Sequence, residues 1–246
     1  MSQRVALTML GGFGLRYQGE RLDLPPSSER VVAYVALHDG PATRLNVAST
    51  LWLDMPEHRA MANLRSALWR LHRLGVGVIQ RFGESLALYP EVDVDVRKLS
   101  AAARGLLDGT LPDEGAHLEE LSDSGELLRD WYEDWVLVER EHFRQIRLQA
   151  LERTASQLTI MGQYGRAAEI ALAAVATEPL RESAHRALIS VHLAQGNRSE
   201  AIRQYCIYRR MMREELDVEP SSQMEALIGS VASAVVLRVT RSLTRR

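Results

Sequence analysis

The sequence predicts a mainly α-helical protein with a small β component, divided into two domains at residues 1–96 and 97–246. Three observations lead to this fold class: glycine-broken β runs open the chain, three helical patterns follow, and the pattern beyond Asp93 is helical with little interruption. With 246 residues, 46% of them hydrophobic and 25% charged, the chain has the composition of globular domains rather than of a disordered protein.

The first domain is expected to begin with a small antiparallel sheet. VALTML, FGLRYQG and RLDLP are short runs rich in β-branched or aromatic residues, and Gly11-Gly12 and Gly19 interrupt them. A helix should then start at residues 25–27 and end at 39–41, where Asp-Gly-Pro cannot continue it. A second helix fits 45–53 with Thr43 as its N-cap, and a third runs from about 58 to 74.

A hairpin completes this domain, because VGVIQR and LALYP read as two strands around a turn that contains Gly83. A sheet, three helices and a hairpin, in this order, are the elements of a winged helix-turn-helix preceded by its own N-terminal β-sheet. The hairpin is the expected wing.

The second domain is expected to be all-α and tetratricopeptide-like, apart from a loop over 109–125. Gly162 and Gly196 are 34 positions apart, and Ala167 and Ala201 repeat at the same offset. This is the tetratricopeptide period, and such helical pairs stack into a groove that typically grips a protein segment.

The third helix carries the strongest functional pattern. At about 100° per residue, one narrow sector collects a polar, acid-free set, and the apolar residues Met61, Leu64, Leu68 and Leu71 lie opposite. In a winged helix this element enters the major groove, where Arg can bind guanine, Asn can bind adenine and Ser can contact bases or phosphate. The sector, the candidate DNA-reading surface, comprises Arg59, Asn63, Ser66, Arg70 and Arg73.

Further candidate DNA contacts flank this sector. Each of them also has an alternative role that does not involve DNA. Arg65 and Arg81 could be solvated surface residues, and Thr43, Arg44 and Ser49 could be capping or solvated groups. Trp69, beside the sector, is expected to pack rather than to stack on a base. The additional candidates are Arg65 on the same helix, Arg81 beside the wing turn, and Thr43, Arg44 and Ser49 around the second helix.

Charge is unevenly distributed along the chain although its net value is only −2. Residues 59–83 contain arginines and no acid, whereas 108–141 contain 12 acids. A local basic zone can attract nucleic acid despite the net charge.

Neither catalysis nor a bound cofactor is expected. The single Cys206 excludes a disulfide or a paired-cysteine metal site, Lys98 lacks the glycine-rich loop of a nucleotide site, and the histidines lack metal-ligand spacing. Asp93 and Asp95 are expected to end the wing and cap the next helix. The sequence has no long apolar segment for a membrane or for secretion, which predicts a cytoplasmic protein without membrane partners.

Several segments are similar to the Streptomyces antibiotic regulatory proteins, which join an OmpR-type winged helix to a bacterial transcriptional activation domain. They are LGGFGLR, STLW and ANLRSALWRLHRLG in the first domain, and DWVLVEREHFRQIRLQALE, EPLRESAHRALISVHLAQGN and REELDVEPS in the second. The resemblance places Asn63, Ser66, Arg70 and Arg73 in a recognition helix. The wing, RFGESLALYP, lacks the Gly-Tyr of many members, and the chain resembles the short members without an ATPase module.

The resemblance implies binding to directly repeated sites in double-stranded promoter DNA, side-by-side homo-oligomers on those sites, and recruitment of RNA polymerase through its subunits. The leading hypothesis is therefore a sequence-specific transcriptional activator. The alternative is a tetratricopeptide protein-interaction adaptor whose winged helix does not read DNA, which the acidic segment and negative net charge favour.

Overall fold

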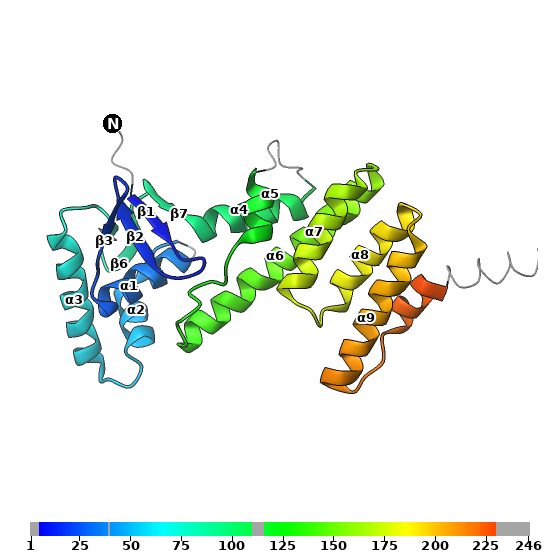
Figure 1. The fold of residues 1–246 in the computed structure, drawn as a ribbon. Coiled ribbons are helices and arrows are strands. Elements are labelled where there is room, and N and C mark those ends of the chain that lie inside the picture. Colours follow the sequence, from blue (N-terminus) through cyan, green and yellow to red (C-terminus); the bar gives the residue numbers. More distant parts are fainter. Residues whose placement is uncertain (1–4, 39, 110–115, 230–246) are drawn as a thin grey trace, which may run out of the picture. The chain divides into compact units, whose positions relative to one another are not determined.

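The computed structural model describes residues 5–38, 40–109 and 116–229, and it divides the chain into two compact units (Figure 1). The first unit comprises Met1–Ala101 and Ser124–Arg144, and the second comprises Ala102–Asp123 and Gln145–Arg246. This division differs from the expected single boundary after residue 96, because the segment 124–144 returns to the first unit.

The N-terminal sheet of the first unit has four strands in the order β3-β2-β1-β7. They are β1 (Val5–Thr8), β2 (Gly14–Tyr17), β3 (Glu20–Leu22) and β7 (Val92–Val94). The first three are antiparallel as expected, whereas β7 joins β1 in parallel, with Val5 opposite Val92 and Leu7 opposite Val94. These four side chains are buried and form one apolar face.

Asp95 follows β7 and begins α4 (Asp95–Leu107). Its carboxylate accepts hydrogen bonds from the backbone N–H groups of Met9 (2.9 Å), Leu10 (3.0 Å) and Val96 (2.6 Å). Burial raises the pKa of the Asp95 carboxyl, while these three N–H donors oppose the rise. Asp95 therefore joins the start of α4 to the residues that follow β1.

Three helices and a second, smaller sheet complete the winged helix. The helices are α1 (Pro26–Leu37), α2 (Arg44–Leu51) and α3 (Glu57–Arg73), and the sheet has the order β4-β6-β5, with β4 (Ala42–Thr43), β5 (Ile79–Phe82) and β6 (Ser85–Leu88). Both α1 and α2 pack against α3. The predicted fold class is confirmed, and Pro25, which precedes α1, suits a helix start because it has no N–H to leave unpaired.

The segment 124–144 pairs with residues 9–11, which follow β1. Gly11 N–H donates to the Glu126 carbonyl and Leu128 N–H to the Met9 carbonyl, each at 2.8 Å, while Leu127 and Leu128 are buried. Arg140 secures the turn by donating to the carbonyls of Leu127 (2.8 Å), Leu128 and Trp131 (2.8 Å). Aromatic contacts follow, with Trp131 stacked on Phe13 and Trp135 edge-on to Tyr34.

The second unit is helical. It contains α5 (Ala116–Asp123), α7 (Tyr164–Thr177), α8 (Glu182–Ala194), α9 (Arg198–Leu216) and helical residues 222–229, while α4 and α6 (Asp134–Ile160) contribute residues to both units. Figure 1 shows α7, α8 and α9 stacked in order, and each contacts the next. The expected loop over 109–125 was wrong at α5, because Leu118 and Leu121 have helical spacing and are buried; residues 110–115 lie outside the described part.

The predicted repeat matches the structure at both of its glycines. Gly162 and Gly196 adopt φ angles of 74° and 85° just after the ends of α6 and α8, in the left-handed region that glycine reaches without steric cost. Ala167 and Ala201 are fully buried one helix later. A small residue is needed there because adjacent helices approach closely.

No helix in the described ranges is long and apolar enough to cross a membrane. Within the same ranges, no group of three or more His, Cys, Asp or Glu residues is arranged to hold a metal ion.

Candidate nucleic-acid interface

The helix α3 buries one face along its whole length. The buried face consists of Ala60, Leu64, Ala67, Leu68 and Leu71, whereas Met61 is only half-buried. Because the two alanines belong to this face, the exposed side of α3 is rotated away from Asn63 and centred near Ser66, Trp69 and Arg73.

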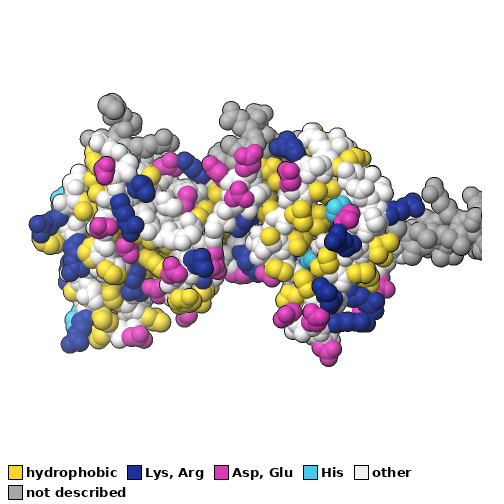
Figure 2. Space-filling model, in the orientation of Figure 1, with side chains coloured by type: hydrophobic (Ala, Val, Ile, Leu, Met, Phe, Trp, Pro, Cys, Tyr) yellow, Lys and Arg dark blue, Asp and Glu magenta, His cyan; other side chains and the backbone are white. Residues whose placement is uncertain are grey.

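A shallow hollow, called here the basic hollow, lies on this exposed side. Its lining residues come from three elements: the start of α2, the middle of α3 and the strand β5 of the wing. They are Arg44, Arg65, Ser66, Trp69, Arg70 and Arg81. No acid lines it, and Figure 2 shows basic side chains along the margin of the first unit where Figure 1 places α3.

Backbone pairing places α2 beside the wing. Thr43 lies opposite Ser85 in the β4–β6 pair, and the N–H of Arg44 donates to the Glu84 carbonyl in the wing turn at 2.8 Å. Arg81 lies opposite Leu86 on the neighbouring strand. The short second sheet therefore brings a helix start and the wing to the same hollow, although the two are about forty residues apart in sequence.

The arginines of this surface have no acidic partner. Among the described residues, no carboxylate lies within ion-pair distance of Arg44, Arg65, Arg70, Arg73 or Arg81. Arg70 Nη1 donates instead to Ser27 Oγ at 3.1 Å, and Arg44 Nε is buried without a hydrogen-bond partner in that part of the chain. Their positive charges are left uncompensated.

Two polar side chains at the site already have local partners. Thr43 Oγ1 accepts from the Asn46 N–H at 3.2 Å and so caps α2 as predicted, while Ser66 Oγ donates to the Ala62 carbonyl at 3.0 Å. Ser66 remains exposed, and its hydroxyl oxygen can still accept a hydrogen bond.

The other candidates lie outside the basic hollow. Arg59 is exposed in the first turn of α3, and Asn63 is half-buried with its Nδ2 donating to Met55 Sδ at 3.2 Å. Ser49 lines a different hollow beside Trp52, and its Oγ donates to the Asn46 carbonyl at 3.0 Å.

Trp69 is the residue that the sequence analysis misjudged. It was expected to pack, but 56% of its surface is exposed, and the Arg73 guanidinium lies 4.9 Å from the centre of its ring. Helical spacing alone could have shown this if Ala60 and Ala67 had been counted with the apolar face. Arg65, which had been placed off the reading sector, likewise lines the basic hollow.

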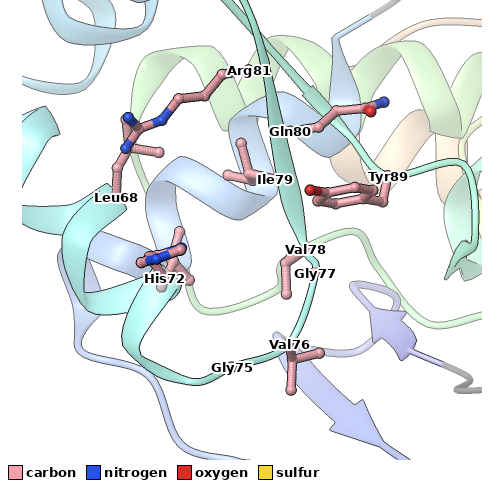
Figure 3. A pocket seen from close by; sticks show the side chains of 11 residues that line it. Leu68, His72, Gly75, Val76, Gly77, Val78, Ile79, Gln80, Arg81 and Tyr89 are labelled. Atoms are coloured by element: carbon pink, nitrogen blue, oxygen red, sulfur yellow. The ribbon is translucent and has the colours of Figure 1, made fainter.

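A second hollow adjoins the C-terminal end of α3 (Figure 3). Leu68, Leu71 and His72 of α3 line one side, and the loop after Gly75 together with Tyr89 lines the other. Figure 3 shows Arg81 extending from β5 toward the α3 side chains, across from Gln80 and Tyr89. Arg81 lines both this hollow and the basic hollow, so the two hollows are adjacent.

Comparisons with known proteins agree with this architecture. A family model described as the bacterial transcriptional activator domain matches residues 94–231. The regulatory protein AfsR of Streptomyces coelicolor is 26% identical over 212 residues, and that of Streptomyces griseus is 24% identical over 215 residues. Each match covers 82% of this chain but only 21% and 22% of the respective relative, so the chain spans about a fifth of their length.

A solved structure shares the fold. Mycobacterium tuberculosis EmbR, in complex with a low-affinity phosphopeptide, superimposes with a TM-score of 0.73 at 18% identity. The match covers 95% of this chain and 66% of the EmbR chain, and therefore includes both the winged helix and the helical repeats.

Proposed function

This chain belongs to the bacterial transcriptional activator domain family, and we propose that it acts by binding a specific sequence of double-stranded promoter DNA through the basic hollow and α3. Membership of this family makes the chain a transcriptional regulator of the AfsR type and not an enzyme, as the sequence predicted. We propose, beyond this membership, which surface binds the DNA and how the protein activates transcription.

The observation that carries the proposal is the clustering of four arginines in one hollow without an acidic partner. Like charges at this spacing repel each other, and a polyanion relieves the repulsion while releasing its own counterions. Arg44 is the one arginine of the hollow that is half-buried rather than exposed. A half-buried guanidinium of this kind suits a phosphate oxygen.

In this proposal each contact has a position. The helix α3 lies in the major groove, where Arg65 and Arg70 reach guanine edges or phosphates and Ser66 reaches a base or a phosphate. Arg44, in the first turn of α2, binds phosphate through its guanidinium. Arg81 extends from the wing to the adjacent backbone or minor groove.

The remaining candidates take peripheral roles. Arg59 and Arg73 contact phosphates at the ends of α3, and Thr43 and Ser49 contact the backbone beside α2. Asn63 has to leave Met55 before it can pair with an adenine, so its contribution is expected to be smaller than its chemistry alone indicates.

The helical unit is proposed to recruit RNA polymerase through its subunits and to align protomers head to tail on directly repeated sites in the bacterial cytoplasm. The support is the resemblance to the Streptomyces regulators and the stack of α7, α8 and α9, whose repeat geometry suits protein segments.

The salt dependence of DNA binding tests the proposal. The parent protein is expected to bind its promoter fragment with an affinity that falls steeply with salt, because each phosphate contact contributes about −0.9 to the slope of log K against log salt. Arg70→Ala should weaken binding by about 1–3 kcal/mol and reduce its sequence preference if Arg70 reads a base. If Arg70 contacts phosphate only, the slope of log K against log salt should instead become shallower by about 0.9, the contribution of one phosphate contact.

The matched control is Arg166→Ala, which removes an exposed arginine of α7 outside the interface and should leave affinity and slope unchanged. A parent protein whose affinity for short duplexes does not change with salt would contradict DNA binding and would favour the protein-interaction adaptor.

A further inference from the structure

Trp69 is an exposed apolar side chain among cations. It lines the basic hollow together with four arginines and Ser66, and 56% of its surface faces solvent. The apolar face of α3, which contains Leu64, Leu68 and Leu71, lies on a different side of the helix. Core packing therefore does not account for this indole, and burying its exposed surface against a partner would be favourable.

We propose that Trp69 is a specificity-determining residue whose indole contacts the 5-methyl group of a thymine in the major groove. The inference rests on the proposed function, because it places α3 in that groove. It extends that function by adding a preference for a base that the arginines do not recognise.

The stacking of Arg73 on Trp69 orients the ring. The guanidinium lies 4.9 Å from the ring centre and one helical turn after Trp69, so it covers part of the indole and restricts its rotation. Arg65 and Ser66 lie one turn before Trp69 and line the same hollow. The uncovered indole surface is thus bordered by Arg65 and Ser66, groups that can bind phosphates and base edges.

The chemistry of the bases selects thymine. Arginine donors pair with the acceptors of guanine, and none of the other residues of the hollow offers a sizeable apolar surface. Among the four bases only thymine presents an apolar group, its C5 methyl, in the major groove. An indole next to guanidinium groups can therefore read thymine while the arginines read guanine or hold phosphate.

Replacement of thymine by uracil tests this inference because it removes only the methyl group. The probe is a duplex selected by the parent protein from a random-sequence pool, resynthesised with deoxyuridine at one thymidine position at a time. The parent should lose about fourfold in affinity at one or more positions, the factor that corresponds to burying one methyl group.

Trp69→Ala should bind the selected duplex about tenfold more weakly and should bind the thymine and uracil forms equally. Trp69→Phe should retain part of the preference for thymine, because an aromatic ring remains. The matched control is Tyr132→Ala, an aromatic that is 77% exposed in the first unit but outside the basic hollow, and it should bind as the parent does. Circular dichroism of each variant checks that the fold is intact.

Three results would overturn the inference while leaving DNA binding in place: a selected duplex without a preferred thymine, a parent that binds every uracil form as tightly, or a Trp69→Ala protein that still prefers thymine. A parent protein that selects no duplex at all would instead overturn the proposed function, and the inference with it.

Discussion

Glu182, at the start of α8, is the centre of a hydrogen-bond network in the second unit. Its carboxylate accepts from the Ser221 N–H at 2.8 Å, from the Ser221 hydroxyl and from the Tyr208 hydroxyl at 3.4 Å, and it lies 3.7 Å from Arg186. Burial, together with the charge of Glu182 and its hydrogen bond, raises the pKa of Tyr208 to about 12. One carboxylate therefore joins α8, α9 and the helical residues after Ser221.

Tyr208 also covers a buried histidine. The His185 ring packs against it in a tilted arrangement, with centroids 4.5 Å apart, and makes 2.8 Å hydrogen bonds to the Pro179 carbonyl and the Gln204 amide. Burial lowers the pKa of His185. The imidazole is thus a buried structural group of the repeat.

The Glu182 carboxylate should make stability depend on pH in a defined direction. Burial, the largest single influence, raises the pKa of Glu182, but the hydrogen bonds from Ser221, the charge of Arg186 and the Tyr208 hydroxyl together lower it below its ordinary value of 4.5. A carboxyl whose pKa is lower in the folded state stabilises the protein above its unfolded pKa, and this contribution disappears as the pH falls through the folded pKa.

Glu182→Gln should therefore lower the free energy of unfolding by about 1–2 kcal/mol at pH 7, and the deficit should shrink below about pH 4.5. Urea unfolding across this pH range measures the effect. Glu200→Gln, which removes an exposed carboxylate paired with Arg203, is the control. A Glu182→Gln deficit that is the same at pH 7 and pH 3 would refute the role of the charge.

At the scale of elements, the two faces of α3 have different roles. The buried face packs on α1 and α2, and the exposed face supplies most of the basic hollow. Stability and DNA binding should consequently be separable by substitutions only a few residues apart.

Leu68→Ala should lower the free energy of unfolding by about 2–5 kcal/mol, because Leu68 is 4% exposed and its removal leaves a cavity under α3. Arg65→Ala, on the exposed face, should leave thermal unfolding within about 0.5 kcal/mol of the parent while weakening DNA binding. Thermal unfolding and duplex binding, measured on both variants, separate the effects. An Arg65→Ala protein that unfolds as easily as Leu68→Ala would contradict this division of α3.

At the scale of the whole molecule, the first unit is built from two parts of the chain. Residues 124–144 return to it after α5 and complete the surroundings of Met9, Leu10 and Gly11. The approach is closest at Gly125, where an added Cβ would lie 2.9 Å from both Cα and N of Gly11. Glycine is required there because backbone, not a flexible side chain, occupies the space.

Gly125→Ala should therefore lower the free energy of unfolding of the first unit by about 1–3 kcal/mol through overpacking. Hydrogen exchange should locate the change, since the amides of Gly11 and Leu128, which bond across this contact, should exchange faster. Gly165→Ala is the matched control: it lies in α7 with nothing within 4 Å of the added Cβ and should stabilise by up to about 1 kcal/mol. Equal stability of the two variants would argue against a close contact at Gly125.

Local pattern alone determined most of the elements and their order. The strands β1, β2, β3, β5 and β6 and the first three helices were predictable because alternation, helical spacing, Pro25 and Gly83 act within a few residues of the chain, whereas β4, β7 and α5 were not predicted. The helical repeat was predictable for the same reason, since Gly162 and Gly196 each end a helix locally. The resemblance in these segments also sufficed to identify the family.

Only the tertiary structure decided which side chains of those elements meet. The bond from the Met9 N–H to Asp95, the parallel pairing of β7 with β1 and the return of residues 124–144 join positions far apart in sequence, and no local pattern specifies such partners. The orientation of α3 depended on packing as well. Small alanines contribute little to an apolar pattern, yet helices that approach closely bury them completely, and their burial is what exposes Trp69 and Arg65 beside Arg44 and Arg81.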